Sequence, residues 1–396
     1  MVRALRSRFS PRRAAFAGIF VVTGLGLLSV GATLPVIPRY VKGPIGAGDV
    51  AVGIVTGAFA ITGLACRPLA GHLADRRGRR RVVIGGALLT AIAGALYFVP
   101  AGVPGLIVAR LFLGAGEGMV YTAGSAWIID LAPPERRGRV IGFYGLAIWG
   151  GLSLGPPIGE LILRASSFEM VWAFAMAAPL LGAAIALRIP ESFTPRESPP
   201  PLARDNLIAR EALLPGLALS LGTVGFAAVA AFLVLHLDER GIGHGAEVFT
   251  AFAATVVLAR ALGGWLPDRF GPIPCLIGAG LIEAVGMSAI ALAQSLPVAI
   301  AGALCMGAAF SLLFPSLALF VLDRVPEERR GVAMGTFTAF FDLGVGLGAP
   351  ATGLAAAIGG YPAAFAVAAV AALGTIAVAM ALRRAAPPEP VAAAAV

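Results

Sequence analysis

The stretch Gly71–Arg81 reads GHLADRRGRRR and has five arginines in six consecutive positions, between two long apolar segments. A charged side chain at the centre of a bilayer costs about 3 kcal/mol on insertion scales, so this many cations cannot lie in hydrocarbon. The stretch is therefore a tight aqueous turn between two membrane spans. A plain cationic anchor on the cytoplasmic side would account for the charge, but not for the ordered positions of Gly71, Asp75 and Gly78.

The overall composition agrees with a chain that lies mostly in a membrane. Of the 396 residues, 58% are hydrophobic and 13% are charged, whereas a soluble domain has about 25% charged residues. Strands that span an outer membrane would be short, with alternating apolar and polar residues. The apolar segments here are long and continuous, so the predicted fold class is an all-α membrane protein.

The charges and the cysteines exclude several other classes of function. The net charge of +9 comes from arginines in short clusters between apolar segments. This is a pattern of membrane topology, so we expect no nucleic-acid partner. Cys66, Cys275 and Cys305 lie singly in apolar segments, so neither a disulfide framework nor a metal site is expected.

Twelve apolar segments, each near the ~20 residues that a bilayer requires, can be drawn along the chain. Numbered in chain order as spans 1 to 12, they cover residues 14–38, 50–70, 82–100, 104–130, 140–164, 169–189, 212–236, 247–266, 274–294, 297–321, 332–358 and 362–382. A long polar connection, rich in proline, serine and charge, runs from Pro190 to Arg210. It predicts a six-helix bundle over 1–189, a central loop over 190–210, and a second bundle with a short tail over 211–396.

The basic residues predict the orientation of the spans, because they concentrate on the cytoplasmic side. With the N-terminus inside, the clusters of arginine fall in the tails and in the cytoplasmic loops. The other side then carries only Arg39, Lys42, Arg164 and Arg240. We therefore predict cytoplasmic N- and C-termini, a cytoplasmic central loop, and a multi-pass protein of the plasma membrane.

The two halves of the chain repeat each other at a fixed offset of 193 residues. The offset aligns Arg67 with Arg260, Asp75 with Asp268, Arg76 with Arg269, and Gly78 with Gly271. Each copy has six spans, which is an even number, so the two copies share one orientation in the membrane. Parallel repeats of this kind are related by an axis along the membrane normal.

The loop Gly71–Arg81 resembles the G-x-L-a-D-R-x-G-R-R signature between the second and third spans of the major facilitator superfamily of transporters. The matching residues are Gly71, Leu73, Asp75, Arg76, Gly78, Arg79 and Arg80. The resemblance implies two parallel six-helix bundles that rock to open a pathway to one side at a time. It also implies that Asp75 belongs to a gate and pairs near the start of span 11 when the cytoplasmic side is shut. The second copy, GWLPDRFGPIP, keeps Asp268 and Arg269 but lacks the following arginines, so we expect a weaker gate there.

The fourth span contains RLFLGAGEG, which resembles the family's motif of an arginine followed by glycines. Arg110 matches the arginine, and Gly114 and Gly116 match the glycines. Glu117 lies about two helical turns after Arg110, so the two side chains share a face at a separation of about 10 Å. We predict proton coupling at Glu117, tuned by Arg110. The alternative is a structural ion pair that closes a helix contact.

The fifth span carries GLSLGPPIGE, from Gly151 to Glu160. It resembles the G-x-x-x-G-P-x-x-G-G signature of drug:proton antiporters, matched by Gly151, Gly155, Pro156 and Gly159, with Glu160 in place of the last glycine. Small residues at every fourth position let helices approach closely, and prolines bend a helix. The motif predicts a pliable seam between the two halves. Ordinary packing of small residues is the alternative.

Span 11 contains Asp342 roughly 15 Å from its cytoplasmic start, near the middle of a ~30 Å hydrocarbon core. Its counterpart in the repeat is Trp149, so this acid has no equivalent in the first half. Asp342 is a candidate coupling or substrate residue, and the alternative is a partner for polar groups where the halves meet. Glu283 lies in span 9, which the resemblance makes peripheral, so we expect a structural or lipid-facing role.

The resemblance also places spans 1, 4, 7 and 10 around a central cavity. The cavity candidates in these spans carry hydroxyl groups: Thr23, Thr33, Tyr121, Thr122, Ser125, Thr223 and Ser311. They predict a mildly polar, mostly apolar cavity that suits an amphipathic molecule.

These observations predict a secondary active transporter, not an enzyme, that exports small amphipathic molecules or drugs in exchange for protons. We expect it to need no cofactor besides the proton gradient and to act as a monomer among membrane lipids. The alternative is a transporter of sugars or other polar metabolites, which would need more paired charges and amides in spans 1, 4, 7 and 10. A membrane-embedded enzyme would need clustered carboxylates or a nucleophile with a base, and a receptor would need a signalling tail.

Overall fold

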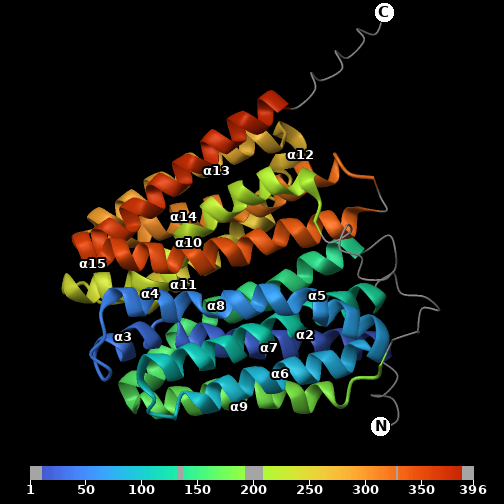
Figure 1. The fold of residues 1–396 in the computed structure, drawn as a ribbon, viewed down its shortest axis with the longest axis horizontal. Coiled ribbons are helices and arrows are strands. Elements are labelled where there is room, and N and C mark those ends of the chain that lie inside the picture. Colours follow the sequence, from blue (N-terminus) through green and yellow to red (C-terminus); the bar gives the residue numbers. More distant parts are fainter. Residues whose placement is uncertain (1–10, 132–136, 192–207, 327–328, 386–396) are drawn as a thin grey trace, which may run out of the picture.

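The computed structural model describes residues 11–131, 137–191, 208–326 and 329–385 (Figure 1). In these ranges the regular structure is helical and no strand occurs, which confirms the all-α prediction. Most of the predicted central loop 190–210 and the end of the predicted tail lie outside the described residues.

The first half of the chain forms the helices of spans 1 to 6. These are α2 (Pro11–Thr33), α3 (Val36–Lys42), α4 (Asp49–Gly57), α5 (Phe59–Arg77), α6 (Arg79–Leu96), α7 (Gly102–Leu131), α8 (Arg137–Ala165) and α9 (Phe168–Ala186). Span 1 consists of α2 and α3, which are interrupted at Pro35, a residue without the N–H that continues a helical ladder. Span 2 consists of α4 and α5, which are interrupted at Ala58.

The second half forms the helices of spans 7 to 12. These are a short 3₁₀ helix η3 (Arg210–Ala212), α10 (Leu213–Glu239), α11 (Gly245–Gly263), α12 (Leu266–Phe270), α13 (Pro272–Leu292), α14 (Leu296–Leu322) and α15 (Arg330–Ala385). The long helix α15 contains two spans. Gly359 and Gly360 leave helical geometry, with Gly360 at φ 72°, and so separate span 11 from span 12.

Ten helical segments of the described chain are long and apolar enough to cross a membrane. One of them, Arg330–Arg384, is divided in two by the break at Gly359 and Gly360. Helix α6 is not among the ten because its 18 residues include three arginines at its start. With α6 added and α15 divided, the structure contains the twelve predicted spans.

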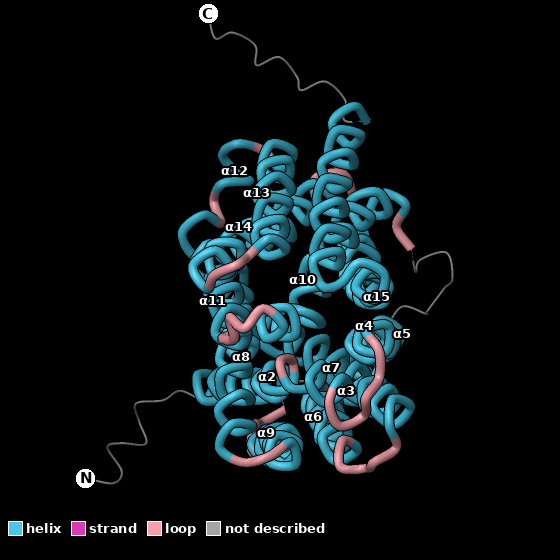
Figure 2. Tube along the Cα trace, turned by 90° about the vertical axis from the view of Figure 1, so that its left-hand side faces the viewer, coloured by secondary structure: helices cyan, strands magenta, loops and turns pink. Residues whose placement is uncertain are grey.

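The two halves of the chain form two groups of helices that pack along a shared face. In Figure 1 the first half occupies the lower part of the molecule and the second half the upper part. Helix α15 packs on α4 and α5, and α11 packs on α8. Figure 2 shows these two contacts on opposite sides of the molecule. Spans 2, 5, 8 and 11 therefore join the halves, and buried apolar residues from both halves form one continuous core.

Both copies of the repeated loop turn at the same glycine. Gly78, between α5 and α6, has φ 96° and ψ 153°, and Gly271, between α12 and α13, has φ 85° and ψ 156°. Positive φ values of this kind suit glycine, which has no Cβ atom to clash. The repeat is thus preserved in the backbone, although the second copy has lost the arginines that follow the turn.

The glycines of the fifth-span motif pack against α2, within the first half. A Cβ atom on Gly155 would lie 2.6 Å from the backbone of Gly31, and one on Gly159 would lie 2.0 Å from the carbonyl oxygen of Ala32. The backbones of α8 and α2 therefore touch directly. The prediction that these glycines form a seam between the halves is wrong, because the face of α8 that meets α11 carries Ser153 instead.

Candidate coupling and substrate site

An ion pair joins the two halves inside the membrane-spanning region. Arg67 of α5 donates from Nε to Oδ2 of Asp342 on α15 at 2.7 Å, and from Nη2 to Oδ1 at 3.0 Å. The side chain of Asp342 is 3% exposed and that of Arg67 is 22% exposed. Two parallel hydrogen bonds satisfy the guanidinium edge and both carboxylate oxygens. Asp342 therefore pairs with a polar group where the halves meet, as one of its two sequence interpretations predicted. Its role as a coupling or substrate residue stays a prediction.

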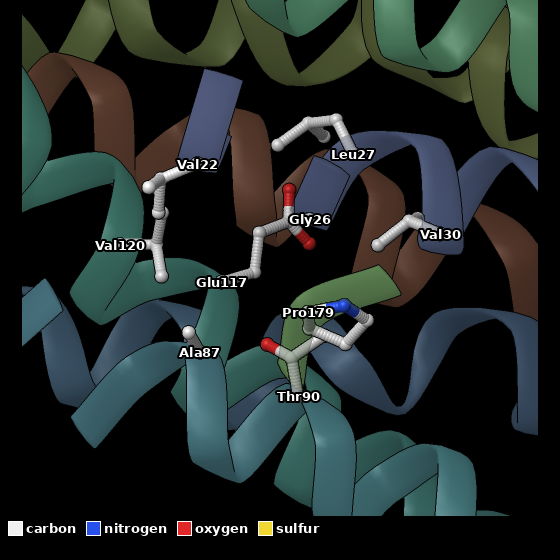
Figure 3. A pocket seen from close by; sticks show the side chains of 9 residues that line it. All are labelled: Val22, Gly26, Leu27, Val30, Ala87, Thr90, Glu117, Val120 and Pro179. Carbon is white, nitrogen blue, oxygen red and sulfur yellow. The ribbon is translucent and has the colours of Figure 1, made fainter. Parts of the chain in front are cut away.

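Glu117 of α7 extends into a small cavity within the first half (Figure 3). The centre of a water molecule has about 10 Å³ to occupy there, which is about enough for one water. Apart from Thr90, the other lining residues are apolar: Val22, Gly26, Leu27, Val30, Ala87, Val120 and Pro179. Oε2 of Glu117 is buried and has no hydrogen-bond partner. An ionised carboxylate without a partner is costly in such surroundings, so this acid is a candidate for proton transfer.

Two arginines lie within electrostatic reach of Glu117, and they are not equivalent. Arg67 interacts with Glu117 more strongly than Arg110 does. Arg110 is 1% exposed, interacts with Tyr97, and has an Nε atom without a hydrogen-bond partner. Arg110, which we predicted to tune Glu117, therefore has the weaker influence on this carboxyl. Arg67, which pairs with Asp342, has the stronger one.

Tyr121 of α7 interacts with the repeat-related arginines of both halves. Its ring is 4.9 Å from Cζ of Arg67, in a cation–π contact. It also interacts electrostatically with Arg260 of α11. Glu117 precedes Tyr121 by about one helical turn, so α7 presents both a carboxyl and a phenol to Arg67.

Four of the other cavity candidates use their hydroxyls in hydrogen bonds within the protein. Thr33, Ser125 and Thr223 donate to carbonyl oxygens three residues earlier, and Thr23 bonds to the hydroxyl of Tyr144. Such internal bonds leave these hydroxyls little capacity to bind a substrate. Ser311 of α14 differs from them, because its side chain is 0% exposed and its hydroxyl has no partner.

The loop Gly71–Arg81 is held by ion pairs with its own half. Arg79 donates from Nη1 to Asp75 at 2.5 Å and from Nε to Asp130 of α7 at 3.1 Å. The carboxylate of Glu191 accepts the backbone N–H groups of Arg79 and Arg80, where the start of α6 favours an anion. Asp75 thus stabilises the loop in this conformation, and its pairing with span 11 stays a prediction for the shut state.

The second copy of the loop is held differently. Asp268 is exposed, and the guanidinium of Arg269 lies over the rings of Trp265 and Phe270, 5.5 Å and 5.6 Å from their centroids. Exposed contacts of this type contribute about 0.5–1 kcal/mol. In the second copy, aromatic contacts thus replace the ion pairs of the first, and the weaker gate there stays a prediction.

The opposite end of the helices carries a second link between the halves. Arg39 of α3 donates from Nε to Asp238 of α10 at 2.7 Å, and it also pairs with Glu160 of α8. The side chain of Glu160 is 7% exposed and accepts a further bond from Arg164 at 2.8 Å. Arg39 therefore connects spans 1 and 5 of the first half to span 7 of the second.

Sequence reasoning assigned no site role to Arg67, Arg260 or Arg39. A signal was present for the first two, since each is an arginine inside an apolar span and both occupy the same position in the repeat. The lipid-facing alternative for Glu283 is wrong. Its side chain is 1% exposed, and its Oε1, which has no hydrogen-bond partner, lies against Gly225 of α10.

Comparison with known proteins agrees with this architecture along the whole chain. The Major Facilitator Superfamily matches residues 19–246 and 213–396. An MFS-type transporter of Salmonella typhimurium strain LT2 is 33% identical over 358 residues, which cover 88% of this chain and 91% of the relative. An MFS-type transporter of Burkholderia mallei strain SAVP1 is 32% identical over 386 residues, which cover 93% of each chain.

Solved transporters share the fold at lower identity. The nucleoside transporter NupG superposes with a TM-score of 0.78 at 13% identity, over 93% of this chain and 99% of that one. The human organic anion transporter MFSD10 superposes with a TM-score of 0.72 at 19% identity, over 94% of this chain and 100% of that one. Twelve spans in two bundles, a repeated loop and close relatives over nearly the full length place this chain in the major facilitator superfamily, whose members are transporters and not enzymes.

Proposed function

We propose that this protein exports small amphipathic molecules in exchange for protons, by alternating access, as a monomer in the plasma membrane. The observation that carries the proposal is the unpartnered Oε2 of Glu117, in a cavity of the first half and under the influence of the Arg67–Asp342 pair. Ionisable groups inside membrane spans are costly and usually functional.

Glu117 and Asp342 compete for one cation. Both acids interact with Arg67, and in this conformation Asp342 holds it through two hydrogen bonds. While Arg67 is held, Glu117 has no partner and holds the proton that it bound from the outer side. When the halves separate, Arg67 leaves Asp342 and turns to Glu117, which then releases its proton. Movement of the halves is thereby linked to proton uptake on one side of the membrane and release on the other.

The contact between the halves supports an amphipathic substrate. The ring of Trp149 lies 6.5 Å, 6.3 Å and 5.5 Å, between centroids, from the rings of Phe226, Phe252 and Phe310. Aromatic surfaces of this kind bind the apolar part of a ligand. The solved neighbours are named for nucleosides and for organic anions, which are two different substrate classes, so fold similarity does not choose between them.

Proteoliposomes that contain a pH-sensitive dye test the proposal. Under an imposed pH gradient, addition of a transported dye, antibiotic or sugar should move protons in the direction opposite to the substrate. Glu117→Gln should abolish concentrative transport and leave gradient-free exchange intact, because glutamine has a similar size and cannot carry the proton. Unchanged concentrative transport in this variant would remove Glu117 from the mechanism.

The matched control is Glu283→Gln. Glu283 is also a buried acid with an unpartnered oxygen, but burial is the only influence on it among the described residues. The Glu283→Gln variant should therefore keep proton coupling.

Proton movement that only sugars elicit would instead favour a transporter of polar metabolites.

A further inference from the structure

The two halves carry the same arginine at equivalent positions, but the positions opposite these arginines differ. Arg67 of α5 and Arg260 of α11 are 193 residues apart, which is the offset of the repeat. By the same offset Asp342, which pairs with Arg67, corresponds to Trp149 of α8. The contacts of α5 with α15 and of α11 with α8 are likewise equivalent. Where the first half pairs its arginine with a carboxylate, the second half therefore has an uncharged ring at the equivalent position.

The guanidinium of Arg260 is correspondingly under-satisfied. Arg67 uses Nε and Nη2 to hold the two oxygens of Asp342. In Arg260 the Nε atom is buried without a hydrogen-bond partner, and Nη2 makes a 3.3 Å bond to the main-chain oxygen of Ser311. The same edge that holds two carboxylate oxygens in Arg67 thus has one weakly bonded and one unpartnered N–H group in Arg260, and no anion. A buried cation without an anion is costly, and a carboxylate from outside would remove that cost.

We propose that Arg260 is the anion-binding residue of the transport site and takes the carboxylate of an organic anion. The inference rests on the proposed function, because it needs a pathway between the halves. Both halves contribute to this position: Tyr121 of the first half interacts with Arg260, and Ser311 of the second half offers a buried hydroxyl without a partner. Arg260 and Tyr121 are half-buried, so neither side chain is fully enclosed by protein.

The surroundings also define the rest of the ligand. Trp149 occupies the position equivalent to Asp342 and belongs to the aromatic cluster with Phe226, Phe252 and Phe310. By the equivalence of the two halves, we infer that an anion whose carboxylate meets Arg260 has these aromatic rings beside it. The substrate class that fits is a carboxylate with an aromatic or aliphatic body, which is the anionic subset of amphipathic molecules.

Binding to the full-length protein in lipid nanodiscs, followed by calorimetry, tests this assignment. The probes are benzoate and naphthoate, with benzamide and naphthamide as uncharged matches. The wild type should bind the carboxylates more tightly than the amides. Arg260→Gln should weaken carboxylate binding by about tenfold to hundredfold, as expected for loss of a charge-assisted pair, and leave amide binding unchanged. Arg260→Lys should weaken carboxylate binding less than Arg260→Gln does, because lysine keeps the positive charge. It should still weaken it, because lysine lacks the two parallel N–H donors of the guanidinium.

A second pair of variants tests the equivalence of the two halves. Trp149→Asp places a carboxylate where Asp342 lies in the other copy, so it should satisfy Arg260 internally and exclude carboxylate ligands. Trp149→Asn removes the same ring without adding charge, so it should keep more of the carboxylate binding than Trp149→Asp. Melting temperatures of the ligand-free variants identify any that fail to fold.

Three results would overturn the assignment: no carboxylate binding by the wild type, wild-type affinity in Arg260→Gln, or an equal loss for carboxylates and amides. These measurements separate the inference from the proposed function. The binding assay contains no proton gradient, so its outcome does not depend on the proton step. Carboxylate binding without proton coupling would refute the exporter mechanism and leave the role of Arg260 standing.

Discussion

Arg39 and Asp238 hold the two halves together at one end of the molecule. Two bonds, 2.7 Å from Nε and 3.0 Å from Nη2, join the guanidinium on α3 to the carboxylate on α10. At the Gly78 end, one membrane span away, the described pairs Asp75–Arg79 and Arg329–Glu211 each lie within one half. Within the part of the chain that the structure describes, direct ionic links between the halves occur at the Arg39 end and at Arg67–Asp342. We interpret this as a conformation closed at the Arg39 end.

Arg39→Gln should favour the conformation that is open at this end. The pair is partly exposed, so its loss should change the ratio of closed to open molecules by about two- to fivefold. Spin labels at Pro44 and Glu239, which are exposed on opposite halves at this end, report the change. Their distance distribution should gain population at long distances.

Lys42→Gln is the control for this experiment. Lys42 lies on the same helix, but its ion pair at 2.9 Å is with Asp49 of the same half, so its loss should leave the label distances unchanged. Equal shifts in both variants would show that the positive charge of α3 matters and not its bond to the second half.

Asp342→Asn should destabilise the protein more than any exposed charge substitution. It leaves the guanidinium of Arg67 inside the membrane without its anion, and breaking a buried pair costs about 3–5 kcal/mol. Arg67→Gln combined with Asp342→Asn removes both charges and should recover part of the loss. Thermal unfolding of the purified variants measures the difference. Strict additivity of the two single losses would contradict a direct pair.

The arrangement of spans followed from local features, and so the sequence predicted it well. Continuous apolar segments and the arginine-rich turn at Gly71–Arg81 determine where the chain crosses a membrane, whichever helices become neighbours. The turns at Gly78 and Gly271 follow from the repeat in the same way. The breaks at Pro35 and Ala58 were not predicted, because each lies within one continuous apolar segment.

The contacts of the candidate site could not be predicted so completely. Arg67 and Asp342 are 275 residues apart in the chain, and which two helix faces meet depends on the packing of all the spans. Glu117 and Asp342 were recognisable because acids are rare in apolar segments. Small residues at Gly155 and Gly159 indicated close packing, but their spacing does not tell which helix packs on them, and that helix is α2.

Gly159→Val should disrupt the contact between α8 and α2. A Cβ atom there would lie 2.0 Å from the oxygen of Ala32, a backbone atom that cannot move aside alone. Overpacking of this kind costs about 1–3 kcal/mol or more, so melting temperature and yield should fall. Gly150→Ala is the control, because no atom lies within 4 Å of its Cβ position, and it should be neutral or slightly stabilising. Equal losses would show that helix propensity matters and not the close approach.

Asp75→Asn should slow transport more than it weakens substrate binding. Asp75 accepts from Arg79, which also holds Asp130, so the substitution loosens the turn between α5 and α6 far from the candidate site. Loss of a partly exposed ion pair removes up to about 1 kcal/mol of stabilisation from the turn. This corresponds to a change of about fivefold in the rate of the conformational step. Initial rates in proteoliposomes and equilibrium binding separate the two effects. Asp268→Asn, in the copy whose aspartate is exposed, should change neither. A loss of affinity at constant turnover in Asp75→Asn would argue against a gate and for a role in binding.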